Sequence, residues 1–161
     1  APGAGSVAVR ATPPVDARPG EAAGTGHAYQ FPLSGQPRVT RAFDPPARRW
    51  LPGHRGVDLA AGDGSVVRAA GTGVVRFAGE VAGRPVVSVD HPDGLRTTYE
   101  PVRPTVATGD RVSAGDPIGV LLPTHAGCPV AACLHWGVRR GTVYLDPLSL
   151  LGLGPVRLLP D

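Results

Sequence analysis

The sequence predicts an all-β domain, built as a sandwich or an open barrel. Short runs rich in valine and aromatic residues alternate with turns of Gly, Pro and Asp at a spacing of about ten residues, which is typical of this class. The 23 glycines and 19 prolines of the chain supply these turns. No long stretch has the apolar stripe of an amphipathic helix.

The order of the elements follows from the same pattern. Residues 1–28 lack lasting periodicity and aromatic side chains, so we expect a flexible linker there and one domain over residues 29–161. Near the C-terminus, Asp146 is expected to cap one short helix that begins at Pro147. Strands are expected over residues 38–43, 65–69, 73–78, 85–90, 95–99, 117–122, 134–138 and 142–144.

Length and composition exclude several classes of protein. The 161 residues fit one domain, and no apolar run approaches the roughly 18–20 residues that span a bilayer. All basic residues are Arg, which excludes a P-loop and a lysine-anchored biotin or lipoyl arm, although "AAGTGVV" resembles biotinyl-carrier barrels. The formal charge of +3 is scattered, so we expect no nucleic-acid partner and a weak preference for acidic polymers such as cell walls.

Two short motifs carry candidate metal ligands. His54 and Asp58 are separated by three residues, and Cys133 and His135 by one. Two His and one Asp suit a catalytic zinc that keeps a fourth position for water. Residues four apart on an ideal strand lie about 13 Å from each other, so the chain between His54 and Asp58 has to bend, and Gly56 would permit the bend. Cys133 and His135 face the same side of a strand.

Five blocks of sequence resemble the lysostaphin/LytM-type zinc endopeptidases that cleave peptide bonds in peptidoglycan. These blocks are "HRGVDLAA", "VVRAAGTGVV", "VVSVDHPDGLRTTY", "GDRVSAGDPIG" and "CLHWGVRRGTVYLDPLSLL", in the order of that family. The resemblance implies an antiparallel β fold with a groove over a zinc site, and His54, Asp58 and His135 as the zinc ligands. It also implies a secreted or cell-wall-associated protein whose signal peptide has been removed, acting on peptidoglycan or its peptides.

Two positions depart from the family pattern. The first His of the family's His-x-His is Cys133 here, and the His of its Tyr-x-His is Pro101. Glu100 is a candidate replacement for the catalytic base if a bulge turns it toward the site. His125, in the loop before the first cysteine, is a second candidate because that loop could reach the site. His91 belongs to a turn before a strand, and we expect it to be structural.

The two cysteines leave three interpretations open. Cys128 and Cys133 form a disulfide that fixes the approach to the metal, or Cys133 is a fourth zinc ligand that closes the site, or Cys133 is a free nucleophile beside His135. A disulfide fits an oxidising compartment.

Two hypotheses for function follow. The first is a zinc-dependent metallo-endopeptidase that hydrolyses peptide bonds of bacterial peptidoglycan. The second is a catalytically weak or inactive relative that binds cell-wall peptides or activates a partner hydrolase through the same groove, because loss of one oxyanion donor or one general base costs roughly a hundred- to a thousandfold in rate.

Overall fold

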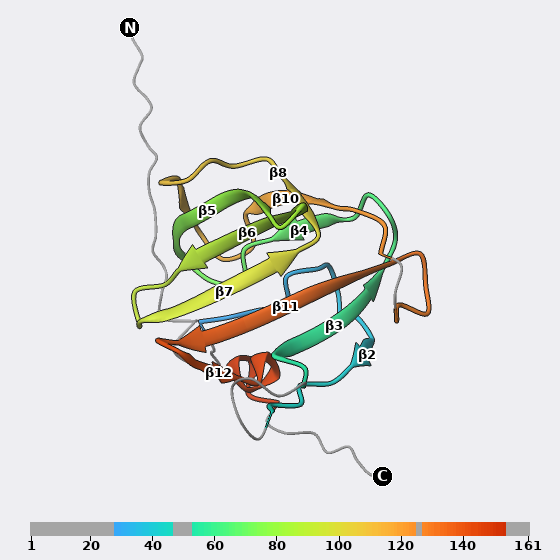
Figure 1. Ribbon diagram of the computed structural model, residues 1–161. Helices are drawn as coiled ribbons and strands as arrows, with labels where there is room; N and C mark the ends of the chain where they lie inside the picture. The colour runs from blue at the N-terminus through green and yellow to red at the C-terminus, as the bar shows by residue number, and fades with distance from the viewer. Residues whose placement is uncertain (1–27, 47–52, 125–126, 154–161) are drawn as a thin grey trace, which may run out of the picture.

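The computed structural model describes residues 28–46, 53–124 and 127–153, and its elements confirm the all-β class (Figure 1). The expected linker therefore lies outside the described residues except for Ala28. In chain order the elements are β2 (Val39–Arg41), β3 (Gly56–Ala61), β4 (Val66–Arg68), β5 (Gly73–Val81), β6 (Arg84–Asp90), β7 (Leu95–Glu100), β8 (Val102–Pro104), β9 (Arg111–Val112), β10 (Pro117–Leu121), β11 (Ala132–Arg140), β12 (Val143–Leu145) and the 3-10 helix η2 (Pro147–Leu151).

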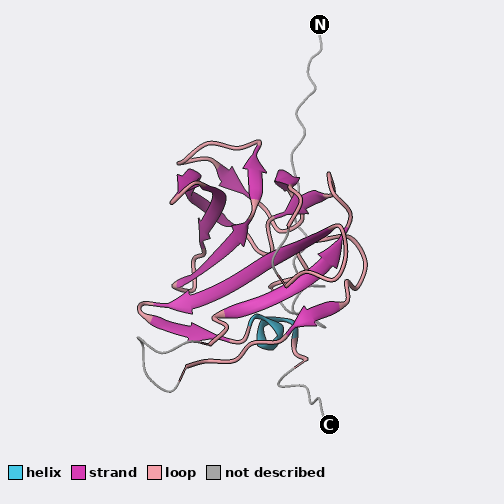
Figure 2. Ribbon diagram, turned by 45° about the vertical axis from the view of Figure 1, so that its right-hand side comes forward, coloured by secondary structure: helices cyan, strands magenta, loops and turns pink. Residues whose placement is uncertain are grey.

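The strands form two antiparallel sheets. The larger sheet has eight strands in the order β2-β3-β11-β7-β6-β5-β9, with β12 added to β11, and it does not close on itself. The smaller sheet has the order β4-β10-β8. Strands β7, β11 and β3 cross the middle of the molecule side by side (Figure 1), and the short helix lies below them (Figure 2). This open antiparallel arrangement is the predicted architecture.

Strand alternation separates a core face from a functional face. Successive side chains of a strand point to opposite sides. In β3, β11 and β7 one set of side chains is fully buried in the main hydrophobic core: Val57, Leu59, Leu134, Trp136 and Tyr99. Two side chains of β10 in the smaller sheet, Ile118 and Leu121, are fully buried in the same core. The alternate residues Asp58, His135 and Glu100 are only partly buried and face away from that core.

The expected elements are present, with differences at short strands. Each of the expected strand ranges overlaps an observed strand, but β3, β8 and β9 were not expected. The predicted short helix is confirmed as a 3-10 segment, in which the Asp146 carboxylate accepts a hydrogen bond from the Leu148 amide at 3.0 Å. Gly152, with φ of 76°, ends it. Among the described residues no helix has the length and apolar character needed to cross a membrane.

His91 is structural, as expected. It is buried at the start of the turn between β6 and β7, and its Nδ1 donates to the Thr72 carbonyl at 2.8 Å. Its Nε2 therefore accepts from the Thr97 hydroxyl, also at 2.8 Å, and that oxygen lies 2.7 Å from the Tyr99 hydroxyl. Burial lowers the pKa of His91 and raises the pKa of Tyr99 to about 12, so both groups stay neutral near pH 7.

Candidate metal centre

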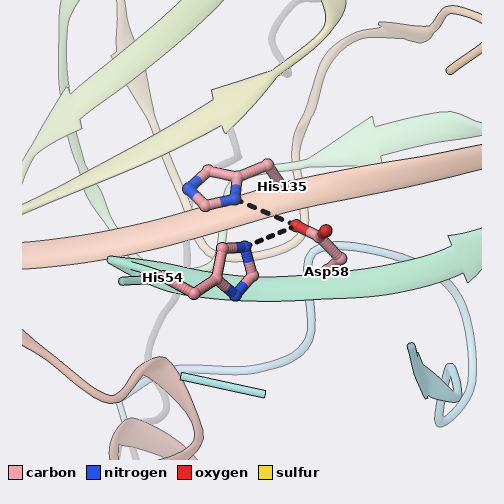
Figure 3. Close-up of side chains that lie close together, drawn as sticks. All are labelled: His54, Asp58 and His135. Atoms are coloured by element: carbon pink, nitrogen blue, oxygen red, sulfur yellow. Dashed lines mark hydrogen bonds and ion pairs between the residues drawn. The ribbon is translucent and has the colours of Figure 1, made fainter. Parts of the chain in front are cut away.

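Three side chains predicted as ligands converge at one point on the functional face. The His54 Nε2 atom lies 3.1 Å from Asp58 Oδ1, and the His135 Nδ1 atom lies 3.0 Å from the same oxygen (Figure 3). The two imidazole rings meet edge to face with centroids 4.9 Å apart. One ligand atom from each of the three residues lies within 4.8 Å of the others, a spacing that suits one shared metal ion.

The bend between His54 and Asp58 lies where the chain enters β3. His54 is not part of β3 and forms an isolated bridge with Asp44, through backbone hydrogen bonds of 2.8 and 2.6 Å. Gly53 allows this close approach, because a Cβ atom there would lie 2.6 Å from the Asp44 carbonyl oxygen. β3 then begins at Gly56 and carries Asp58 on its outward side. His54 and Asp58 therefore meet without sharing one regular strand.

Gly56 acts differently from the prediction. Its φ is not positive, so the bend makes no use of glycine's extra backbone freedom. A Cβ atom at Gly56 would instead lie 2.5 Å from the Trp136 carbonyl oxygen and 2.9 Å from Cε1 and Nε2 of His135. Gly56 therefore provides the space in which the His135 ring lies.

A hydrogen bond to the backbone orients the His54 ring so that Nε2 is the nitrogen available to bind a metal ion. Its Nδ1 lies 2.9 Å from the Ala42 carbonyl oxygen, and only a protonated nitrogen bonds to a carbonyl. In neutral His54 the Nε2 lone pair therefore faces the Asp58 carboxylate, and two acceptors at 3.1 Å need a proton or a cation between them. Orientation of a ligand imidazole by a carbonyl is the usual arrangement in metal sites. The donor set of two nitrogens and one carboxylate oxygen thus fits zinc.

The carboxyl group of Asp58 is kept ionised. Burial on its own raises the pKa of Asp58, but the hydrogen bond from His135 and the charges of both imidazoles outweigh it and hold the pKa below its usual value. An ionised carboxylate is the form that binds a metal ion.

The three side chains line an open pocket of about 480 Å³. A neighbouring pocket of about 230 Å³ shares Glu100 and His135 with it, so the two form one groove over the strands of the functional face. The residues of the larger pocket are Arg41, His54, Asp58, Arg84, Glu100, Pro101, Pro123, Thr124, Cys133 and His135. Those of the smaller one are Arg55, Thr98, Glu100, His135, Gly137, Val138, Arg139 and Tyr144.

Glu100 lines this groove, and β7 has no bulge beside it, in contrast to the expectation from the sequence. β7 pairs with β11 in unbroken register, and Glu100 is directly opposite His135. Asp58 is opposite His135 on the other side, so Asp58, His135 and Glu100 form one row across β3, β11 and β7. Glu100 is the last residue of β7, and its carboxylate lies 3.8 Å from the Arg84 guanidinium.

Cys128 and Cys133 form a disulfide, with their Cα atoms 5.8 Å apart. Cys133 lines the groove two residues before His135. Because its sulfur atom is bonded to that of Cys128, Cys133 is neither a thiolate ligand nor a free nucleophile, and those two interpretations are excluded. His125 lies outside the described residues.

Two arginines of the larger pocket were missed by sequence reasoning. Arg41 and Arg84 line the same pocket as the three predicted ligands. Each is a single arginine in an ordinary strand or turn sequence, and only the strand register brings it to the site.

Comparison with known proteins identifies the family. The sequence profile of peptidase family M23 matches residues 52–147, which is more than half of the chain. The chain belongs to peptidase family M23. The matched M23 region contains His54, Asp58 and His135 together with most strands of the larger sheet.

Several relatives of this M23 chain are known. It is 54% identical over 134 residues to Uncharacterized protein Rv2891 of Mycobacterium tuberculosis, a match that covers 81% of this chain and 54% of the relative. The chain thus spans about half the length of the curated relatives it matches.

Among solved structures, the catalytic domain of the antimicrobial peptidase lysostaphin from Staphylococcus simulans is 26% identical, with a TM-score of 0.61 over 72% of this chain and 92% of that domain. A chain of the SpoIIQ-SpoIIIAH pore forming complex is 25% identical, with a TM-score of 0.64 over 78% and 91% of the two chains.

Proposed function

We propose that this M23 protein is a zinc-dependent endopeptidase that hydrolyses peptide bonds of bacterial peptidoglycan outside the cytoplasm. The observation that carries the proposal is the convergence of two imidazole nitrogens and one carboxylate oxygen within 4.8 Å, on the wall of an open groove. Family membership and the likeness to the lysostaphin catalytic domain support it. The disulfide is consistent with an oxidising compartment.

In this proposal the zinc ligands are His54 through Nε2, His135 through Nδ1, and Asp58 through its carboxylate. Zinc, when bound, would act as a Lewis acid on the scissile carbonyl and lower the pKa of a water molecule toward neutrality. The protein's own part is to hold the three donors at fixed positions. The Ala42 carbonyl orients His54, and the space above Gly56 accommodates His135.

Glu100 is the proposed general base. Opposite residues of an antiparallel pair have Cβ atoms roughly 4.5–5.5 Å apart, so the Glu100 carboxylate lies one side chain away from His135. From there it would accept the proton of the attacking water and later deliver it to the leaving amine. Arg84 would hold the carboxylate at the edge of the groove. His125 remains a second candidate for this role.

A weaker or purely binding protein is the second candidate function. The two non-ligand histidines of the resembling family correspond to Cys133 and Pro101, and Cys133 is held in a disulfide. A partner-binding role would suit this loss, and the likeness to a chain of a pore forming complex favours it. In this case the same groove would bind wall peptides or activate a partner hydrolase.

The experiment that tests the proposal incubates purified peptidoglycan with the zinc-loaded chain and measures released fragments by mass spectrometry. The expected result is one zinc per chain and release that stops after chelation. Asp58→Asn should lose both zinc and release. Glu100→Gln should keep zinc and lose about a hundredfold or more in kcat, whereas Arg76→Gln, an exposed position on β5 outside the groove, should change neither. Zinc uptake without any release by the unaltered chain would refute the peptidase and favour the binding protein.

A further inference from the structure

Positive charge surrounds the groove. Four arginines line its two pockets: Arg41 and Arg84 in the larger one, and Arg55 and Arg139 in the smaller one. Apart from the proposed ligand Asp58, Glu100 is the one carboxylate among the described lining residues. A bound divalent cation would add to this excess. The groove therefore has a positive field that favours an anionic ligand.

Arg41 reaches the groove through an irregularity in β2. The pairing of β2 with β3 shifts register between Val39 and Arg41, so that Thr40 and Arg41 together lie opposite Asp58. A bulge of this kind changes the direction of the side chains beside it. The Thr40 hydroxyl is directed toward Asp58 and Cys133, at 3.3 Å from the Asp58 carbonyl oxygen and 3.6 Å from Cys133 Sγ. Arg41 lines the pocket next to them.

The row across the sheet thus has four members. Arg41 is paired with Asp58, Asp58 with His135, and His135 with Glu100, across β2, β3, β11 and β7, which lie side by side in Figure 1. Neighbouring strands lie about 4.8 Å apart, and an extended peptide advances about 3.3 Å per residue. Arg41 is therefore within one or two substrate residues of a bond held over Asp58 and His135.

The two arginines of the larger pocket differ in their partners. The Arg84 guanidinium lies 3.8 Å from the Glu100 carboxylate, so part of its charge is balanced. Arg41 is exposed, and no carboxylate of the described residues pairs with it. The unbalanced charge of the larger pocket is thus on its β2 side.

From these observations we propose that the substrate is an acidic peptide, with a carboxylate one or two residues from the scissile bond that Arg41 binds. This inference rests on the proposed function, since it assigns the substrate chemistry of the same groove. A guanidinium binds a carboxylate through two parallel hydrogen bonds, which makes Arg41 a specificity-determining residue. The carboxylate belongs either to a side chain or to the chain terminus of the peptide. Amidating one kind of carboxylate at a time distinguishes these two sources.

The test measures binding separately from hydrolysis. Fluorescent peptidoglycan stem peptides are prepared in three forms: with all carboxylates free, with side-chain carboxylates amidated, and with the terminal carboxylate amidated. Their affinity for the zinc-loaded chain is measured by anisotropy at low salt. We expect about a tenfold weaker Kd for the form that lacks the recognised carboxylate, and a smaller difference at high salt because the charges are exposed.

Variants of Arg41 decide the assignment. Arg41→Gln should bind all three forms alike and Arg41→Glu should prefer the amidated form, while Arg76→Gln should keep the preference of the unaltered chain. Circular dichroism establishes that each variant is folded. Equal binding of the three forms by the unaltered chain, or a preference that persists in Arg41→Gln, would overturn the inference. Selective binding without cleavage would support it while refuting the peptidase, so the two failures are distinguishable.

Discussion

Replacing Gly56 with alanine is expected to disturb both the sheet and the candidate metal centre. The new methyl group would lie 2.5 Å from the Trp136 carbonyl oxygen and 2.9 Å from two atoms of the His135 ring. The carbonyl belongs to β11, which pairs with β3 at this point, so it has little freedom to move. We therefore expect either that the His135 imidazole moves away from the Asp58 carboxylate or that β3 and β11 separate at this point.

The size of the effect follows from these contacts. Adding a methyl group to a filled interior typically costs about 1–3 kcal/mol. For a chain of this length each kcal/mol lowers Tm by about 2–4 °C, so the expected loss is between about 2 and 12 °C. If His135 is a zinc ligand as proposed, a change in the position of its ring should also weaken zinc binding about ten- to a hundredfold.

Gly137→Ala is the matched control. A Cβ atom at Gly137 would lie 3.4 Å from the Arg55 carbonyl oxygen and 3.8 Å from His135 Nε2, which is ordinary contact, and its φ is not positive. This variant should be as stable as the unaltered chain or more stable by up to about 1 kcal/mol. Thermal melts of the metal-free proteins and competition titrations with a zinc-binding dye measure the two effects. If Gly56→Ala melts and binds zinc like Gly137→Ala, the explanation of Gly56 as space for His135 is wrong.

Three further predictions concern stability. Burial lowers the pKa of His91 below its unfolded value, so the stability that neutral His91 contributes is complete above about pH 6.5 and is lost as pH falls through the folded pKa. The free energy of unfolding in urea should therefore differ less between pH 7.5 and pH 5 in His91→Gln than in the unaltered chain. An equal difference in the two proteins would contradict this. Replacing both Cys128 and Cys133 with serine removes a short cross-link that restricts the unfolded chain, so the free energy of unfolding in denaturant should fall by about 2 kcal/mol. An unchanged free energy of unfolding would contradict this explanation. Asp146→Ala should cost about 1 kcal/mol, because the Leu148 amide loses its cap, and an unaltered Tm would show that the cap is dispensable.

The strands that the sequence predicted are those with valine and aromatic residues between clear turns. β3 was missed because its sequence, GVDLAA, has one β-branched residue and a glycine, and its stability comes from pairing with β2 on one side and β11 on the other. β9 has only two residues and is too short to leave a periodic pattern. Tertiary pairing, which no local pattern encodes, therefore supplied the missing strands.

The grouping of the three proposed ligands could be predicted from the sequence, and their surroundings less so. His54, Asp58 and His135 come from motifs with recognisable residue types, and the structure brings them together. The place of Glu100 could not be derived, because it depends on which residue of β7 pairs with His135. Arg41 depends in the same way on the bulge in β2.

A crystal structure of the zinc-loaded protein, with anomalous data collected at the zinc edge, would show whether His54, Asp58 and His135 hold the metal ion. The prediction is one strong peak per chain, bonded to His54 through Nε2, to His135 through Nδ1 and to a carboxylate oxygen of Asp58, at about 2.0–2.2 Å from each. A peak bonded to other residues, or no peak in crystals grown with excess zinc, would contradict the assignment of this cluster as the metal centre.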